Sequence, residues 1–295
     1  MILVTGATGP LGSAIVSSLL KTTPASSIAV LVRDAAKVKD LAARGVEIRV
    51  GEYDKYDSLI KAFTGIDQLL FVSGNDVVNR SAQQANVVAA AKQAGVRQVV
   101  YTSFQRKNET ASSPIAFVAK AHLETEEALK ASGMTYTILN HNIYADMIPI
   151  FIGGKVLEAG TIFLPAGNGK VAYALRTDMA EAAANILSGK GHENKTYEIT
   201  GSAALSYGEI AEIISEVSGK KISYVSPTQE VFREEMTKAG VPDHYIGLFA
   251  GFSEAARQKE FDHVDPMLEK LLGRRPVSVR EYLKGIYSPA AGIPA

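Results

Sequence analysis

Short apolar runs alternate with helical segments over the first half of the chain. Runs rich in Val, Ile and Leu predict buried strands, and stretches with apolar residues at helical spacing predict the connections between them. The predicted strands are 2–4, 28–33, 46–50, 68–73, 98–103 and 135–139, and the predicted helices are 11–21, 35–44, 56–63, 82–94 and 115–132. Because parallel strands need helix-sized crossovers, the pattern predicts an α/β fold with a parallel sheet covered by helices on both faces.

The regular alternation ends near residue 140. Later segments are shorter and richer in glycine, with a predicted strand at 197–200, a helix at 207–218 and a mostly helical stretch at 232–272. We expect them to form a smaller C-terminal α/β lobe over the carboxyl edge of the sheet. The predicted division is a nucleotide-binding domain at 1–140, its sheet completed by later segments, a mainly substrate-binding lobe at 141–288, and a flexible tail at 289–295.

Composition narrows the class of ligand. The chain has 31 basic and 31 acidic residues, so no charge excess favours nucleic acid. It has no cysteine, and its five histidines lack the short spacings of metal ligands, so no metal site is expected. The first apolar run lacks the basic flank of a signal peptide, and no apolar stretch reaches the roughly 20 residues of a membrane span. We therefore expect a cytoplasmic protein that binds a small molecule.

Three glycines follow the first predicted strand in the pattern Gly-x-x-Gly-x-x-Gly. Gly6 permits a tight turn, Gly9 lets the backbone approach a diphosphate, and Gly12 lets the helix pack close to the strand. The N–H groups that open the helix attract an anion. A glycine-rich turn without a ligand has the same spacing, but a position between a buried strand and a helix favours a dinucleotide site in a doubly wound Rossmann sheet. The remaining expected contacts of this turn are Thr8, Pro10 and Leu11.

The end of the second predicted strand bears on the choice of cofactor. A guanidinium at Arg33 suits the 2′-phosphate of NADPH, whereas an acid at Asp34 suits the ribose hydroxyls of NADH. Asp34 is also well placed to cap the following helix. We therefore expect NADPH, with NADH less favoured, although Arg33 could equally be a solvated loop charge.

Small polar residues follow the next three predicted strands. Ligands of doubly wound sheets bind outside the carboxyl ends of the strands. Asp54 is a candidate contact of the adenine edge, although a turn residue there needs no function. The candidate contacts of the ribose and nicotinamide are Ser73, Gly74, Asn75, Thr102 and Ser103. Each suits a turn as well, but their recurrence at successive strand ends favours a cofactor cleft.

Several segments together resemble the NmrA-like branch of the atypical short-chain dehydrogenases/reductases. They are Val4–Gly12, Leu31–Arg33, Tyr101–Ser103, Gly133–Leu139 and Gly191–Tyr197. Within that branch the chain is most similar to bacterial NAD(P)H:quinone oxidoreductases and triphenylmethane reductases, over nearly its whole length. The resemblance implies a Rossmann fold and a nicotinamide cofactor.

The chain departs from ordinary short-chain reductases at the proton donor. None of its twelve tyrosines has a lysine four residues later, so the usual Tyr-x-x-x-Lys pair is missing. The resemblance places His122 where plant relatives have a lysine, eleven residues before Gly133. His122 is either a proton donor or a partly buried structural histidine. The resemblance also implies that Asn142 and Tyr144 line the nicotinamide and substrate pocket.

Two functions remain open from the sequence. A quinone accepts hydride readily and needs little acid assistance, so the missing Tyr-Lys pair favours an NADPH-dependent reductase of quinones or similar conjugated acceptors. The same absence suits a non-catalytic NAD(P)-binding redox sensor. No Gly-x-Ser-x-Gly elbow is present, which disfavours a serine hydrolase. The oligomeric state is open between monomer and homodimer.

Overall fold

A seven-stranded parallel sheet forms the centre of the molecule. The computed structural model describes residues 1–289. The strands of the sheet are β1 (Ile2–Val4), β2 (Ile28–Val32), β3 (Glu47–Val50), β4 (Gln68–Val72), β5 (Gln98–Phe104), β6 (Thr135–His141) and β9 (Lys195–Ile199). Their order is β3-β2-β1-β4-β5-β6-β9, so the chain reverses its direction of travel between β1 and β4. Ligands of this architecture bind at that reversal.

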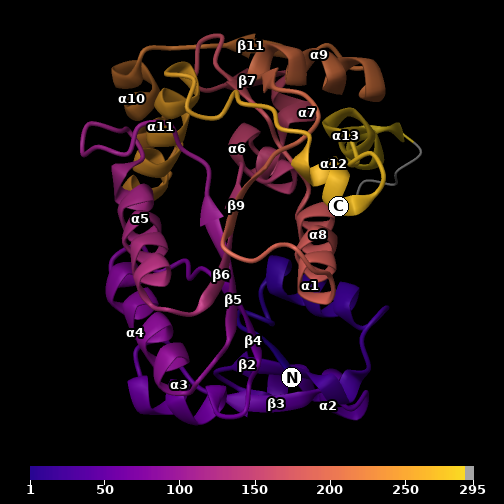
Figure 1. Cartoon of the computed structure of the whole chain (residues 1–295). Coiled ribbons are helices and arrows are strands. Elements are labelled where there is room, and N and C mark those ends of the chain that lie inside the picture. Colours follow the sequence, from indigo (N-terminus) through magenta and orange to yellow (C-terminus); the bar gives the residue numbers. More distant parts are fainter. Residues whose placement is uncertain (290–295) are drawn as a thin grey trace.

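Helices cover both faces of the sheet (Figure 1). One face carries α1 (Pro10–Leu19), α8 (Arg176–Ser188) and α12 (Met267–Leu272), which share a core with the strands that includes Ile15, Val30 and Met179. The other face carries α3 (Tyr56–Phe63), α4 (Arg80–Gln93) and α5 (Ala116–Ala131), which bury Phe63 and Phe71. The strands are apolar on both faces because both faces are covered.

The remaining elements form a lobe at one end of the sheet, at the top of Figure 1. Its helices and turns are η3 (Ala145–Met147), α6 (Ile148–Ile152), α7 (Val156–Ala159), α9 (Tyr207–Ser218), α10 (Gln229–Lys238), α11 (Asp243–Arg257) and α13 (Val279–Tyr287). Its strands pair as β7 (Thr161–Phe163) with β11 (Ser223–Val225) and as β8 (Lys170–Val171) with β10 (Leu205–Ser206). A separate hydrophobic core that includes Phe232 and Phe261 holds these elements together.

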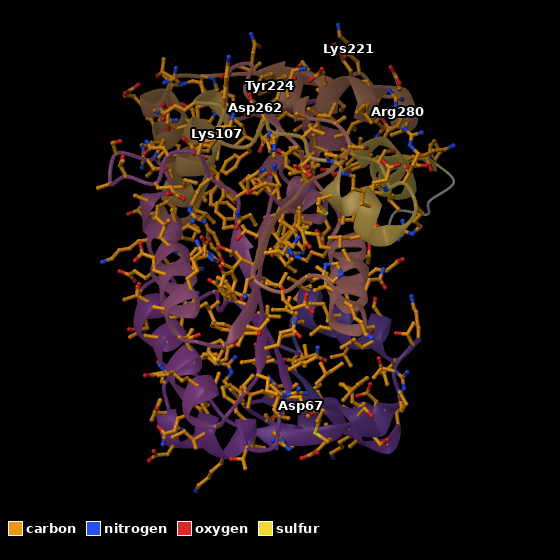
Figure 2. All side chains as sticks on the ribbon, viewed as in Figure 1. Asp67, Lys107, Lys221, Tyr224, Asp262 and Arg280 are labelled. Carbon is orange, nitrogen blue, oxygen red and sulfur yellow. The ribbon has the colours of Figure 1, made fainter. Side chains whose placement is uncertain are left out.

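Contacts at the strand ends join this lobe to the sheet. The backbone N–H groups of Lys107 and Asn108, in the loop after β5, donate to the buried carboxylate of Glu260 at 2.8 and 2.9 Å. Lys107 also forms an ion pair with Asp262, and Figure 2 shows the two side chains beside each other. The lobe is therefore fixed directly above the ends of the strands that were predicted to carry the site.

The predicted doubly wound fold is confirmed, with adjustments at several elements. The strand expected at 197–200 begins earlier, at Lys195, and becomes the seventh strand of the main sheet. The helix expected at 35–44 is divided into a 3-10 turn, η2 (Ala35–Val38), and a short helix, α2 (Lys39–Ala43). A further 3-10 turn, η1 (Ala25–Ser27), precedes β2.

No helix within residues 1–289 combines the length and the apolar character that crossing a bilayer requires. The flexible tail predicted at 289–295 lies outside the described residues apart from Pro289.

Candidate active site

The turn between β1 and α1 needs glycine at two positions. Gly6 has a φ of +63°, in the left-handed region that side chains disfavour. A Cβ added to Gly12 would lie 2.2 Å from the Gly6 carbonyl oxygen, inside any tolerable contact. The turn is closed by the Gly9 N–H, which donates to the Gly6 carbonyl at 2.9 Å. The glycines therefore bring helix and strand backbones into the contact predicted from their spacing.

The first turn of α1 presents a bare N-terminus at the end of β1. Gly9 is the N-cap and supplies no side-chain cap, Pro10 is the first helical residue, and no acidic residue lies in the first turn. The helix dipole and the unpaired N–H groups at this end favour an anion. These features fit the diphosphate of a dinucleotide, which would lie against Gly9, Leu11 and Gly12.

A groove of about 340 Å³ opens beside this turn. Thr8 lines it from the glycine turn, and Lys37 and Arg44 line it from η2 and the end of α2. Arg33 lies on the exposed surface just before η2. Asp34 accepts a hydrogen bond from the Ala36 N–H at 2.9 Å and caps η2, which is the capping role considered for it in the sequence. The sequence did not identify Lys37 or Arg44 as candidate cofactor contacts, although Lys37 lies only four residues after Arg33.

The ends of β3 and β4 are joined by side-chain hydrogen bonds. The Tyr53 hydroxyl lies 2.6 Å from Thr5 Oγ1 and 2.8 Å from the carbonyl oxygen of Val72. Gln83 donates to the exposed Asp54 carboxylate at 3.1 Å. A Cβ on Gly74 would lie 3.4 Å from Gln83 Oε1, which is an ordinary contact, so the packing of this loop does not require a glycine. These bonds hold the predicted adenine and ribose contacts in fixed positions.

The predicted hydroxyls after β4 and β5 are bonded to protein groups. Thr102 Oγ1 accepts from the Ser73 N–H at 3.0 Å. Ser73 Oγ accepts from Gln84 at 2.8 Å, and Ser103 Oγ donates to Glu126. Thr102 and Ser103 are both buried, whereas Asn75 is exposed. In this structure Thr102 therefore fixes the end of β4, and Ser103 ties β5 to α5.

A buried hydrogen-bond chain surrounds His122. Tyr101 lies 2.6 Å from Gln84 Oε1 and 2.7 Å from His122 Nδ1. Gln84 Oε1 also accepts from the Thr125 hydroxyl at 2.5 Å. Because an amide oxygen can only accept, the single Tyr101 proton points to Gln84, so His122 Nδ1 carries the proton of the other bond. This leaves Nε2 of a neutral His122 with a free lone pair.

The environment of His122 disfavours its charged form. Burial lowers the pKa of His122 well below its usual range, and the positive charges of Arg80 and Arg106 lower it further. At neutral pH the ring is therefore uncharged and has Nε2 available as an acceptor. The two roles considered in the sequence, proton donor and structural histidine, both have to accommodate this neutral ring.

A buried ion pair lies one helical turn beyond His122. Arg106 contacts both carboxylate oxygens of Glu126, at 2.9 and 3.0 Å, and both side chains are almost fully buried. Arg106 also reaches Glu109 on the surface at 3.2 Å. The pair fixes the loop after β5 to α5 and gives Ser103 its carboxylate acceptor.

Asn142 braces the loop after β6. Its side-chain amide donates to Gln105 Oε1 at 2.5 Å and to the Phe261 carbonyl at 2.9 Å, and its oxygen accepts from the Ile143 N–H at 2.6 Å. Gln105 in turn donates to Glu198 at 2.8 Å. The predicted residue Asn142 thus links β6 to the loop after β5 and to the C-terminal lobe.

Tyr144 lies at the edge of the same cluster and is only half-buried. The guanidinium of Arg176 stacks over its ring, 4.3 Å from the centroid, and pairs with Asp146 at 2.6 Å. Burial raises the pKa of Tyr144 to about 12, so its hydroxyl keeps its proton at neutral pH. His141, the last residue of β6, is buried with no hydrogen bond at either ring nitrogen, and burial lowers its pKa to about 3.

Sequence reasoning missed most of the side chains that surround His122. Gln84 and Glu126 lie on helices and have no local motif, and Tyr101 belongs to an apolar strand pattern. Only the spacing of His122 and Glu126, four residues apart on one helix, places two of them on a common face. The others come together through the order of the strands.

Comparisons with known proteins identify the family and match the fold. Quinone oxidoreductase 2 of Escherichia coli (strain K12) is 35% identical over 288 residues, covering 98% of this chain and 99% of that protein. The structure of the E. coli NADPH-dependent quinone oxidoreductase complexed with NADPH has a TM-score of 0.90 and 36% identity, covering 96% of this chain and 98% of that one. The Citrobacter sp. triphenylmethane reductase complexed with NADP(H) has a TM-score of 0.89 and 38% identity, covering 96% and 99%. The model of the NmrA-like family matches residues 1–283, and the chain belongs to that family, as its motifs predicted.

Proposed function

We propose that this protein is an NADPH-dependent reductase that transfers hydride to a quinone or a similar conjugated electrophilic acceptor. The observation that carries the proposal is the β1–α1 turn, in which a Cβ at Gly12 would collide with the Gly6 carbonyl and the helix N-terminus is uncapped. The similar quinone oxidoreductase and triphenylmethane reductase are both named for conjugated acceptors and were both crystallised with NADPH or NADP(H).

The chain's own residues divide between binding and orientation. The bound cofactor supplies the hydride. Gly9, Leu11 and Gly12 would hold its diphosphate through backbone N–H groups. Arg33, with Lys37 in the neighbouring groove, would hold the 2′-phosphate that separates NADPH from NADH.

The acceptor side would be formed by the ends of β5 and β6 and by the C-terminal lobe, from which β9, α8 and α12 are excluded because they belong to the main sheet and its cover. Tyr144 keeps a protonated hydroxyl at neutral pH and His122 offers a lone pair at Nε2, so the two supply one donor and one acceptor. The ring of a quinone needs orientation more than acid catalysis, and the fixed hydrogen bonds of Asn142 and Gln105 provide a rigid frame. We propose that the protein works in the cytoplasm, where NADPH is regenerated, as a monomer or a homodimer.

Turnover is the direct test. NADPH oxidation is followed by absorbance with benzoquinone and with a triphenylmethane dye, against a reaction without protein. We expect oxidation that depends on both protein and acceptor. Rates equal to the protein-free reaction would contradict the reductase and favour an NAD(P)-binding sensor.

Cofactor choice is tested separately by binding. Arg33→Ala and Lys37→Ala are titrated with NADPH and NADH by fluorescence, with exposed Lys92→Ala on α4 as a control. Loss of a charged hydrogen bond of about 1.5–3 kcal/mol corresponds to roughly 10- to 100-fold weaker NADPH binding and little change for NADH. An equal loss of affinity for NADPH and NADH would show that neither residue contacts the 2′-phosphate.

A further inference from the structure

Arg80 is a buried cation at the carboxyl edge of the sheet, and the fold does not explain its function. It is the first residue of α4, directly after the loop that follows β4. Only 8% of Arg80 is exposed, and its Nε atom is fully buried without a hydrogen-bond partner. A side chain of this kind is costly to bury because a guanidinium loses its hydration.

No carboxylate compensates Arg80 within residues 1–289. None lies within the 4.0 Å of an ion pair from its guanidinium, and Asp76 acts on it only at longer range. Asp76 is itself engaged by the N–H and amide of Asn79 and by Gln83. Arg106, in the loop after β5, is a useful contrast, because it is also buried and pairs through two bonds with Glu126. The chain thus neutralises one buried arginine and leaves the other one for a different partner.

Arg80 lies near residues of β5 and of the segment after β6, the part of the candidate site assigned above to the acceptor. Burial lowers the pKa of Arg80, while the neighbouring Tyr101, Asp76 and Tyr144 raise it. Its charge in turn acts on His122. Tyr101 belongs to β5 and Tyr144 follows β6, which are two and three strands away from β1. With strands about 4.8 Å apart, β5 and β6 lie roughly 10–14 Å from β1 across the sheet, and β1 leads into the helix N-terminus that suits the diphosphate.

We infer that Arg80 binds the oxyanion that the acceptor becomes when it receives hydride. The inference rests on the proposed function. Hydride transfer moves one hydrogen and an electron pair from the reduced cofactor to the quinone, so the cofactor is oxidised and the quinone becomes a hydroquinone monoanion. Solvent then supplies one proton to complete the hydroquinone. A guanidinium that is largely shielded from solvent stabilises the negative oxygen before that proton arrives. This accounts for a reductase site without a Tyr-Lys pair.

A phenol whose ionised form absorbs visible light tests this inference without turnover. Such a nitrophenol is titrated against pH in the complex of the protein with NADP⁺, using the wild type, Arg80→Met and Arg80→Lys. Arg97→Met is the matched control, because Arg97 is an exposed arginine paired with Asp67 at the opposite end of the sheet (Figure 2). The titratable and charged groups that interact with Arg80 are Tyr101, Asp76, Tyr144 and His122, and all are unchanged in these variants.

We expect the wild type to bind the phenolate at least 10-fold more tightly than the phenol. Arg80→Met should abolish this preference, Arg80→Lys should retain part of it, and Arg97→Met should match the wild type. Thermal unfolding should show that Arg80→Met is no less stable, because it removes an unpaired buried charge.

Two results would overturn the inference. One is an unchanged phenolate preference in Arg80→Met. The other is a loss of NADPH affinity of 10-fold or more with an intact phenolate preference, which would make the cofactor diphosphate the oxyanion that Arg80 binds. If the wild type binds phenolate through Arg80 but oxidises no NADPH with quinones, the proposed function fails while the oxyanion site stands.

Discussion

The two halves of the candidate site are built in different ways. At the β1–α1 turn, the groups that would face a ligand are backbone N–H groups, and their positions follow from glycines six residues apart. At the ends of β5 and β6, the groups are side chains on four separate elements, joined by hydrogen bonds such as Tyr101 to His122. The geometry of the first half requires positions without side chains. The geometry of the second half depends on hydrogen bonds between polar side chains.

This difference determines how mutations should act on the two halves. A turn made of backbone tolerates no added atom at the close contact, but it contains no buried charge. A network of buried side chains tolerates similar shapes but is destabilised when one polar partner is lost. Mutations in each half can separate the sensitivity to added atoms from the sensitivity to lost polar partners.

The largest effect is expected at Glu126 in the side-chain half. Glu126→Leu removes the carboxylate that neutralises buried Arg106 and accepts from Ser103, leaving a buried cation without a partner. The free energy of unfolding should fall by about 3–5 kcal/mol, as measured by denaturant titration. Replacing both partners with apolar residues, Arg106→Met together with Glu126→Leu, should recover most of that loss.

An exposed pair gives the control for this experiment. Lys238 pairs with Glu234 on the surface of α10, and Glu234→Leu should change stability by less than about 1 kcal/mol. A loss at Glu126 no larger than the loss at Glu234 would mean that the buried pair does not hold the strand ends together.

The next effect is expected in the backbone half, at Gly12. In Gly12→Ala the new Cβ would meet the Gly6 carbonyl at 2.2 Å, so helix and strand must separate. Overpacking of this kind costs about 1–3 kcal/mol, and the displaced helix N-terminus should bind NADPH at least about 10-fold more weakly. Gly154→Ala, where nothing lies within 4 Å of the added Cβ, should leave stability and NADPH binding as in the wild type. Tight NADPH binding by Gly12→Ala would contradict the role given to this turn.

The same difference explains how much the sequence could predict. The fold and the glycine turn are encoded locally, because strand periodicity and the need for glycine act within about ten residues. The hydrogen bonds around Tyr101 join residues that are 17 and 21 positions apart, and the bond of Gln84 with Thr125 spans 41 positions. Arg80 belongs to the same group, since only the folded chain shows that it lacks a carboxylate. Such partners depend on strand order and helix rotation, which periodicity does not specify.

The pH dependence of stability should report on His141, one of the two buried histidines of the side-chain half. Burial lowers the pKa of His141 to about 3 in the folded protein, whereas the unfolded chain binds a proton near pH 6.5. Stability is therefore full above pH 6.5 and falls as the pH drops toward 3, because only the unfolded chain is protonated in that range. At pH 5 the loss from His141 should be about 2 kcal/mol.

Denaturant titrations at pH 7.5 and pH 5.0 measure this loss. His141→Leu should reduce the loss by about 2 kcal/mol and should be at least as stable as the wild type at pH 7.5, because neither ring nitrogen has a partner to lose. His244→Gln on the surface of α11 should leave the pH dependence unchanged. An identical pH dependence in His141→Leu and the wild type would exclude His141 as its source.

The smallest effect in stability is expected at Tyr101, and it is the most specific to the side-chain half. Tyr101→Phe keeps the ring but removes the hydroxyl that accepts from His122 Nδ1, which should cost about 1 kcal/mol. Nitrogen NMR should show the proton on Nδ1 in the wild type and shared between Nδ1 and Nε2 in the variant, because neither nitrogen then has a protein partner that selects the tautomer. Tyr56→Phe, which removes an exposed bond to Gln93, should leave the His122 signals unchanged. A wild-type proton on Nε2 would mean that Tyr101 donates to His122, that the Gln84 amide is turned the other way, and that His122 faces the cleft as a hydrogen-bond donor.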